Sequence, residues 1–207
     1  MFSPNLVAKF ATAAVFAAAL VVLPACSINV KDKNKNGQST VDIKSPIGDL
    51  HVDEQPDIRE AGLSVYPGAR PAPKENGEDK KSANVNLSFP GFALKVVAAE
   101  FASDDSSDKV LAYYNRELQK YGKAIQCHGP WNGGDVAVNA DKSTWQHKNG
   151  EGLSKPVSCR DSGSGDSVEL KVGSEGNQHV VAVKPQGKGS RFALVYVRAR
   201  TGKDNTI

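Results

Sequence analysis

Residues 103–122 read SDDSSDKVLAYYNRELQKYG, and this stretch predicts the one long helix that follows the N-terminal region. Serine and aspartate oxygens at 103–108 can accept hydrogen bonds from the free amide groups of the first helical turn and complement its positive end. Gly122 can take the left-handed conformation that ends a helix. The apolar side chains recur at three- and four-residue steps, so they form one face that needs a sheet to cover it. This face comprises Val110, Leu111, Tyr114, Leu118 and Tyr121.

Strands are predicted directly before this helix. Residues 84–89 alternate apolar side chains with asparagine and serine, which is typical of a half-buried strand. Residues 92–101 form a second apolar segment, and Pro90-Gly91 between the two is a candidate hairpin turn.

Further strands are predicted after the helix. The most regular part of the chain is its C-terminal end, where three apolar segments are spaced as antiparallel strands. The predicted strands are residues 123–128, 157–160, 167–172, 179–184 and 191–198, with a turn at 186–189. We therefore expect an α+β fold in which one main helix packs on an antiparallel sheet, formed by residues 57–200 and followed by a C-terminal tail at 201–207.

Composition narrows the class of protein. The chain has 207 residues, which allows one core domain with additional segments. Nineteen glycines and eleven prolines favour a loop-rich chain with strands over a helix bundle. The 26 basic side chains nearly balance the 23 acidic ones. Such a balance provides no large field of one sign, so no nucleic-acid partner is expected.

The first 26 residues carry a targeting pattern. One early positive charge, Lys9, precedes an apolar run at 10–22 and the tetrapeptide Leu23-Pro24-Ala25-Cys26. A membrane-spanning helix needs about 20 apolar residues, whereas this run has the length of a signal-peptide core. The pattern resembles a bacterial lipoprotein signal peptide, expected as a helix over residues 1–25. Pro24 departs from the usual small residue, and an ordinary cleaved signal with a free Cys26 thiol is the alternative.

The resemblance implies lipidation of Cys26 and a location in the bacterial cell envelope, anchored by lipid and facing the periplasm. Ser27 is similar to the residue found in lipoproteins sent to an outer membrane, because Asp at that position is associated with retention in the inner membrane. The outer membrane is therefore favoured.

Residues 26–56 are expected to be the lipidated N-terminus and a polar linker. Lysine and asparagine outweigh the apolar residues here, which favours a flexible tether to about Glu54. Alternation of Val and Ile with polar residues around Asn36-Gly37 suggests a β-hairpin instead, which alone in water is barely stable.

Two cysteines, Cys127 and Cys159, remain once Cys26 carries a lipid. In an oxidising compartment they suggest one disulfide. A loop of about 30 residues would stabilise the fold by roughly 3 to 4 kcal/mol in the chain-entropy model. Two free structural thiols are the alternative, and without a Cys-x-x-Cys spacing a redox role is not expected.

The segment Tyr66-Pro67-Gly68-Ala69, the strand pair after it and the helix together resemble a recurrent domain of uncharacterised bacterial secreted proteins and lipoproteins. In that family a YPGA segment precedes strands and a V-x-x-[FY]-Y-x-x-x-L-x-x-x-G helix. The resemblance implies a fold and no activity, because its motif residues are core or turn residues. Tyr114 is accordingly interpreted as an anchor on the helix face.

One segment has the pattern of a catalytic site. In Ser106-Ser107-Asp108-Lys109 the hydroxyl of Ser106 stands one turn from the amine of Lys109, as in penicillin-recognising serine enzymes. The partner motifs Ser-Asp-Asn and Lys-Thr-Gly are missing from the sequence, and helix capping accounts for both serines. We therefore expect a protein that is not an enzyme, with a small periplasmic serine hydrolase as the alternative.

No cofactor or metal site is predicted. The four histidines lack the i, i+4 spacing of a metal site, and the aspartate groups do not match the ligand positions of an EF-hand. These residues are His51, His128, His147 and His179, and Asp104, Asp105, Asp108, Asp161 and Asp166. A metal-binding envelope protein stays a second alternative.

Both tryptophans, Trp131 and Trp145, lie in a predicted excursion at 129–153 that has one short strand at 136–138. Exposed aromatic side chains often anchor partners, so they could mark a surface for an envelope protein or a glycan. The interpretation we favour is that they fold back over the sheet edge near the disulfide. The sequence thus predicts an envelope binding or structural module.

Overall fold

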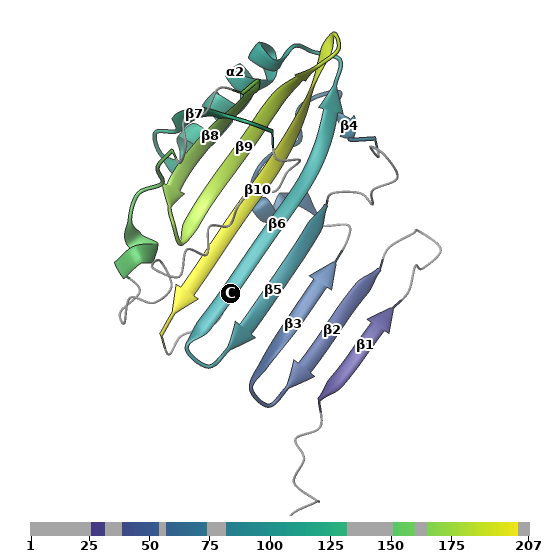
Figure 1. Cartoon of the computed structure of the whole chain (residues 1–207), viewed down its shortest axis with the longest axis vertical. Helices are drawn as coiled ribbons and strands as arrows, with labels where there is room; N and C mark the ends of the chain where they lie inside the picture. Colours follow the sequence, from purple (N-terminus) through teal and green to yellow (C-terminus); the bar gives the residue numbers. More distant parts are fainter. Residues whose placement is uncertain are drawn as a thin grey trace, which may run out of the picture.

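The structure is a computed structural model that describes residues 26–31, 39–53, 57–73, 82–131, 151–159 and 165–202. Ten strands form one antiparallel sheet in the order β1-β2-β3-β5-β6-β10-β9-β8-β7, and β4 pairs with β6 beyond the end of β5 (Figure 1). The strands are β1 (Ser27–Lys31), β2 (Thr40–Ser45), β3 (Gly48–Asp53), β4 (Arg70–Pro71), β5 (Ala83–Phe89), β6 (Phe92–Ser103), β7 (Ile125–Gly129), β8 (Ser167–Ser174), β9 (Asn177–Gln186) and β10 (Gly189–Thr201).

The predicted strands before the helix and at the C-terminal end are confirmed. β5 and β6 join through a turn at Pro90-Gly91, where Gly91 has a φ of 86° that favours glycine. β9 and β10 join through Gly187-Lys188, within the predicted turn. β10 runs to Thr201, three residues beyond the predicted strand at 191–198 and one beyond the predicted domain boundary at 200.

The longest pairing, between β6 and β10, forms the centre of the sheet and runs from Phe92↔Thr201 to Ser103↔Ser190. Successive side chains point to opposite sides of a strand, so this pair contributes to two layers. One face, here called the helix-side face, carries a large apolar cluster with the helix, and the other, the far face, carries a smaller cluster around Val180, Val195 and Val197.

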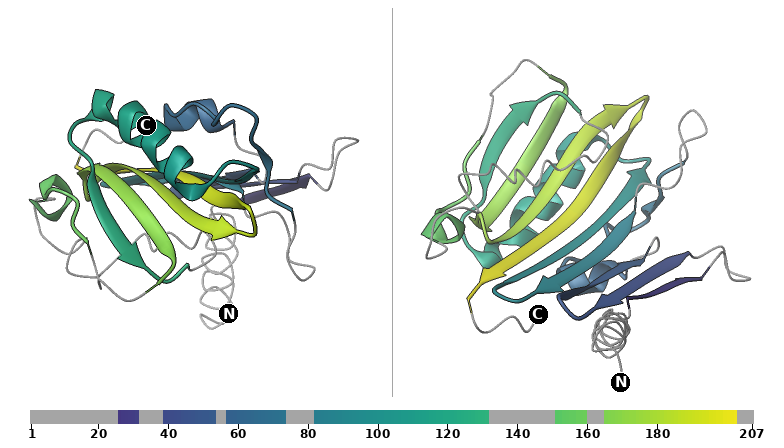
Figure 2. Two further views of the ribbon diagram at one scale, coloured as in Figure 1. Left: turned by 90° about the horizontal axis from the view of Figure 1, so that it is seen from above. Right: turned by 60° about the horizontal axis from the view of Figure 1, so that its bottom comes forward.

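The predicted helix is α2 (Ser107–Glu117), which continues as the 3-10 helix η2 (Leu118–Tyr121). Another 3-10 helix, η1 (Ile58–Ala61), precedes β4 in the chain. Figure 2 shows α2 and η1 on the same face of the sheet. Val110, Tyr114 and Leu118 are fully buried, as the spacing predicts. Their partners in the sheet are Val97, Leu170, Val172, Val181, Val183, Phe192 and Leu194.

Both ends of the helix differ in detail from the sequence analysis. Ser106 is the residue that precedes the first turn, but its hydroxyl makes no capping hydrogen bond. Instead its carbonyl oxygen accepts hydrogen bonds from the amides of Lys109 at 3.1 Å and Val110 at 3.3 Å. Gly122 has φ 130° and ψ −170°, so it leaves the helix through a conformation suited to glycine that is not the left-handed helical one.

The flexible tether predicted for residues 26–56 is wrong for the described part of that range. β1, β2 and β3 pair in an antiparallel meander, and β3 pairs with β5 from Asp49↔Ser88 to Asp53↔Asn84. A lone hairpin is marginal in water, but β5 provides a third partner that extends the same sheet. Residue 57 is therefore no boundary of the sheet. The turn at Asn36-Gly37 lies outside the described residues, as do the signal helix at 1–25 and the strand at 136–138.

Residues 157–160 were expected as a strand, and the described residues 157–159 are not one. The segment is held against the β8–β9 turn by a bridge between Pro156 and Ser174 and by a hydrogen bond from the Val157 amide to the Gly173 carbonyl at 3.2 Å. Proline has no amide donor, which limits a regular ladder here.

An ion pair is buried between the two central strands. The Arg191 guanidinium donates two hydrogen bonds to Oε2 of Glu100, and the bond from Nε is 2.9 Å long. The two side chains are 4% and 3% exposed. The pair is therefore shielded from water, which makes each charge dependent on the other.

Within the described ranges, no helix is long and apolar enough to cross a membrane.

Candidate ligand-binding face

The N-terminal half of the sheet has a polar side. Asn29, Asp42, His51, Asn86 and Lys95 stand opposite one another on β1, β2, β3, β5 and β6. Residues in register share a face of the sheet. Lys95 pairs with Arg198, which lies on the same side of β10 as Phe192 and Leu194 of the helix-side cluster. The row therefore lies on the helix-side face. Parallel rows above and below it are also polar, and they comprise Ser27, Lys44, Asp49 and Ser88, and Lys31, Thr40, Asp53 and Asn84.

A cavity of about 290 Å³ lies on this side of β2, β3 and β5. Six polar side chains line it, namely Asp42, Lys44, Asp49, His51, Asn86 and Ser88. The three apolar residues in the lining, Ile43, Leu50 and Leu87, alternate with these and point to the far face, so their backbone forms the floor between two polar rows. The polar cavity results from the alternation that builds the sheet.

Asp42 and His51 form the closest polar pair in the cavity. Nδ1 of His51 lies 2.6 Å from Oδ1 of Asp42. This hydrogen bond lowers the pKa of Asp42 below its usual value, against a smaller opposing effect of burial, and the charges of His51, Lys31 and Lys44 lower it further. The carboxylate therefore stays ionised and fixes the imidazole through Nδ1.

Glu60 of η1 holds the neighbouring amides in place. Its Oε2 accepts hydrogen bonds from Nζ of Lys95 at 2.8 Å and from Nδ2 of Asn84 at 3.1 Å. Asn86 in turn donates to Oδ1 of Asn84 at 3.1 Å. η1 is itself capped by Asp57, whose carboxylate accepts a hydrogen bond from the Arg59 amide at 3.0 Å. The side chains of Glu60, Asn84 and Asn86 therefore form a chain of hydrogen bonds that fixes the orientation of both amides.

The polar face combines amides, an imidazole, hydroxyls and charges of both signs. Some of these groups already have partners, because Asp42 is hydrogen-bonded to the His51 imidazole and Lys95 forms an ion pair with Glu60. A surface of this kind supplies alternating hydrogen-bond donors and acceptors without a net field. It suits a neutral ligand rich in hydroxyl or amide groups better than a strongly charged one.

A second cavity, of about 500 Å³, lies at the other end of β6. Arg70 and Asp104 in its wall form an ion pair at 2.9 Å, and Lys188 borders it from the β9–β10 turn. Pro71, Pro73, Ala102 and Gly189 form much of its remaining wall, so fewer side chains here can make hydrogen bonds to a ligand than in the first cavity.

The Ser-x-x-Lys segment is not arranged as a nucleophile with its base. Nζ of Lys109 donates to Oδ1 of Asp105 at 2.7 Å, and the hydroxyl of Tyr66 donates to the other oxygen of that carboxylate at 2.9 Å. The hydrogen bond to Asp105 raises the pKa of Lys109. A lysine that activates a serine needs a lowered pKa, so this geometry works against Ser106 as a nucleophile.

The candidate metal ligands are dispersed. Across the described ranges, no group of three or more His, Cys, Asp and Glu side chains is placed to hold an ion. His128 pairs with Gln126 at 3.2 Å, and His179 stacks on Tyr121 with ring centroids 3.7 Å apart. Burial lowers the pKa of His179 to about 4. His147 and Asp161 lie outside the described residues.

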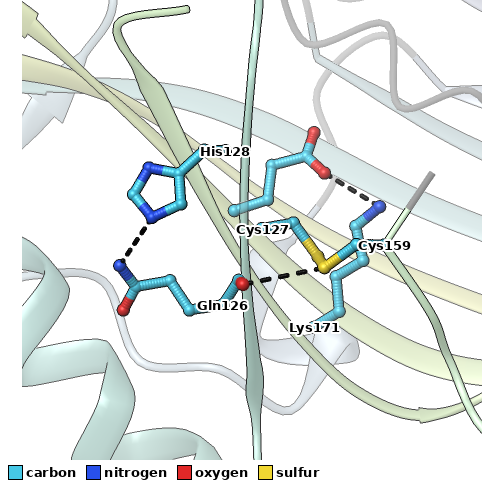
Figure 3. Close-up of a disulfide and its surroundings, with 6 residues drawn as sticks. Gln126, Cys127, His128, Cys159 and Lys171 are labelled. Atoms are coloured by element: carbon cyan, nitrogen blue, oxygen red, sulfur yellow. Dashed lines mark hydrogen bonds and ion pairs between the residues drawn. A yellow bond between two sulfur atoms is a disulfide. The ribbon is translucent and has the colours of Figure 1, made fainter. Parts of the chain in front are cut away.

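The predicted disulfide is present. Cys127 of β7 bonds to Cys159, with the two Cα atoms 5.4 Å apart (Figure 3). Figure 3 also shows the Cys159 sulfur beside the carbonyl oxygen of Gln126, at 3.6 Å. The bond ties the edge strand β7 to the segment that follows the 3-10 helix η3 (Glu151–Ser154). Cys26 is an exposed free cysteine directly before β1.

Of the two tryptophans, Trp131 is described and Trp145 lies outside the described residues. The ring of Trp131 lies under Nζ of Lys184, which is 5.0 Å from its centroid. Trp131 therefore lies against β9, on the opposite half of the sheet from the polar cavity.

Sequence reasoning did not identify the polar cavity. The signal for it was present, because the polar members of β2, β3 and β5 alternate with Val, Ile and Leu at every second position. No known protein family, curated protein or solved structure matches this chain.

Proposed function

We propose that the protein is a lipid-anchored module of the bacterial cell envelope, facing the periplasm, that binds a polar ligand and does not turn it over. Cys26 would carry the lipid, and the polar face of β2, β3 and β5 would bind the ligand. The outer membrane is the favoured location because Ser27 follows the cysteine.

The observation that supports binding most strongly is the row Asp42, His51 and Asn86. These side chains are only half-buried, and they line a cavity whose floor is backbone. Binding sites typically consist of a few fixed polar groups in a concave surface. A neutral glycan matches the mixture of amide, hydroxyl and imidazole groups, and its binding would need no metal or cofactor.

Intact mass measurement of protein extracted from native membranes tests the anchor. We expect a chain that begins at Cys26 and carries acyl groups, with two alkylatable thiols that appear only after reduction. A chain that keeps residues 1–25, or that lacks acyl groups, would contradict the proposed anchor and location.

Titration with a neutral N-acetylated oligosaccharide tests the ligand class. We expect saturable binding that Asn86→Ala weakens by about tenfold, which corresponds to one lost hydrogen bond of about 1.4 kcal/mol. Asn29→Ala is the matched control, because Asn29 belongs to the same row but does not line the cavity. No binding, or equal weakening by both variants, would contradict a glycan site in this cavity.

The alternative of a serine hydrolase lacks geometric support because Lys109 is bound to Asp105. The alternative of a metal-binding protein lacks a ligand cluster within the part of the chain that the structure describes. Neither alternative explains the polar cavity, and so we favour the binding module.

A further inference from the structure

Three exposed apolar side chains gather at one end of the sheet. Ile28 near the start of β1 is 67% exposed, Ile47 in the β2–β3 turn is 77% exposed, and Phe89 at the end of β5 is 41% exposed. The pairings Ser27↔Lys44 and Asp49↔Ser88 place these positions at the same end of their strands. Figure 1 shows the start of β1, the β2–β3 turn and the β5–β6 turn along the lower end of the sheet. We call Ile28, Ile47 and Phe89 the apolar edge.

The apolar edge is continuous with an apolar row on the far face. Ile28, Ile43, Leu50, Leu87 and Leu94 stand opposite one another on five successive strands. Next to this row, the rings of Phe89 and Phe92 stack with centroids 4.9 Å apart across the Pro90-Gly91 turn. The edge is therefore the rim of a broader apolar surface.

The clustering is specific to this region of the described surface. Six large apolar side chains are exposed over the whole described surface, and four of them belong to the apolar edge or to the strand β1 beside it. The set comprises Ile28, Val30, Ile47, Val65, Phe89 and Tyr121. Tyr121 is accounted for by its hydrogen bond to the Gly62 carbonyl at 2.5 Å. Scattered exposed apolar residues are ordinary, whereas a contiguous group marks a contact surface.

The position of Cys26 identifies what this surface contacts. Cys26 directly precedes β1, so a lipid on it would leave the molecule at the apolar edge. No linker separates the cysteine from the sheet, and the bilayer would therefore lie within one or two residues of Ile28. Apolar side chains beside a lipid anchor gain by entering the boundary between headgroups and acyl chains.

We infer that the apolar edge docks on the bilayer surface, with Ile47 and Phe89 inserted between the lipid headgroups. The inference rests on the proposed lipidation of Cys26. In this orientation the strands rise from the membrane, and β6, with twelve residues, carries its far end about 40 Å away. The polar cavity then faces sideways, where a ligand can reach it.

Tryptophan reporters at the edge test this arrangement in the full lipidated protein. Ile47→Trp and Phe89→Trp are compared with Val65→Trp, whose site is also exposed but adjoins Tyr66 near the opposite end of β6. Each variant is inserted into vesicles of phosphatidylethanolamine and phosphatidylglycerol that contain lipid with a doxyl quencher near the headgroup. The wild-type signal from Trp131 and Trp145 is subtracted.

We expect both edge reporters to be quenched at least about twofold more than Val65→Trp, with emission shifted to shorter wavelength. Equal quenching at all three positions, in protein whose mass shows acylation, would overturn the inference and leave the proposed anchor intact. Emission that shifts with protein concentration and without quenching would overturn it in favour of a second copy of the chain on this edge. Protein without acyl groups would contradict the anchor itself and, with it, this inference.

Discussion

The hydroxyl of Tyr114 on α2 accepts a hydrogen bond from the backbone amide of Tyr66 at 3.0 Å, and it donates to the Ser64 carbonyl at 3.1 Å. One side chain thereby satisfies two backbone groups of the segment before the Pro67-Gly68 turn. Burial raises the pKa of Tyr114 far above its usual value, so the hydroxyl keeps its proton and can serve both bonds. Tyr114 is thus a structural anchor between helix and loop.

Tyr114→Phe should lower the free energy of unfolding by about 1 to 3 kcal/mol, because it removes the partner of the Tyr66 amide and of the Ser64 carbonyl, whose hydrogen bonds to the hydroxyl are part-buried. Urea unfolding at neutral pH measures the loss. Tyr113→Phe is the matched control on the adjacent residue, which is only partly buried, and we expect it to change stability by less than about 0.5 kcal/mol. Equal losses in the two variants would argue against a special role for the Tyr114 hydroxyl.

Stability should fall between pH 6.5 and pH 4 because of His179. Its pKa is lowered from 6.5 to about 4, chiefly by burial, so the unfolded chain binds the proton more readily than the folded one. The contribution is fully present above pH 6.5 and is lost as the pH falls through about 4. The full shift corresponds to about 3 kcal/mol, and partial solvent screening reduces the expected loss to about 1 to 3 kcal/mol.

Unfolding of wild type and His179→Gln at pH 7, 5.5 and 4.5 measures this dependence. The variant loses the stacking of the imidazole on Tyr121, so it should be less stable at pH 7 and flatter across the window. Asp42, Asp57, Asp104, Asp105 and Glu117 have lowered pKa values that act mainly below about pH 5, and because they are present in both proteins their effects cancel in the comparison. Parallel curves for the two proteins would show that His179 is not the titrating group.

Glu100→Gln should destabilise the sheet by about 3 to 5 kcal/mol, because it leaves the Arg191 charge buried beside a neutral side chain. The double variant Glu100→Leu with Arg191→Met removes both charges and keeps similar volume, so it should recover most of this loss. Chemical unfolding of the wild type and the two variants compares the two losses in stability. A double variant less stable than Glu100→Gln would indicate that the pair is worth more than an apolar replacement.

Local patterns were sufficient to predict the central part of the fold. The alternation in β5 and the helical spacing of Val110, Tyr114 and Leu118 each concern neighbours in sequence, and the structure confirms both elements. The pairing of β3 with β5 was not predictable in this way, because it joins segments separated by the loop that carries η1. Of the lysines and asparagines that suggested a solvated tether, Asn29, Lys31 and Lys44 belong to the polar side of β1 and β2, and the others lie outside the described residues.

The candidate site was missed for the same reason. Asp42 and His51 are nine residues apart in one hairpin, but Asn86 comes later in the chain, and only the pairing of β3 with β5 brings it into the same row. The disulfide was predictable because two cysteines allow one pairing. The conformation around Cys159 was not, since contacts with the β8–β9 turn determine it.

The pairing of β6 with β10 has a consequence for the order in which the chain can fold. Glu100 and Arg191, which this pair brings together, are 91 residues apart in sequence. At a synthesis rate of about 5 to 20 residues per second, β6 waits roughly 5 to 20 seconds for its central neighbour. During that interval the meander from β1 to β6 has an unpaired inner edge and an uncovered apolar side. Any folding that begins before β10 is available therefore leaves β6 with an unpaired strand edge, which favours aggregation.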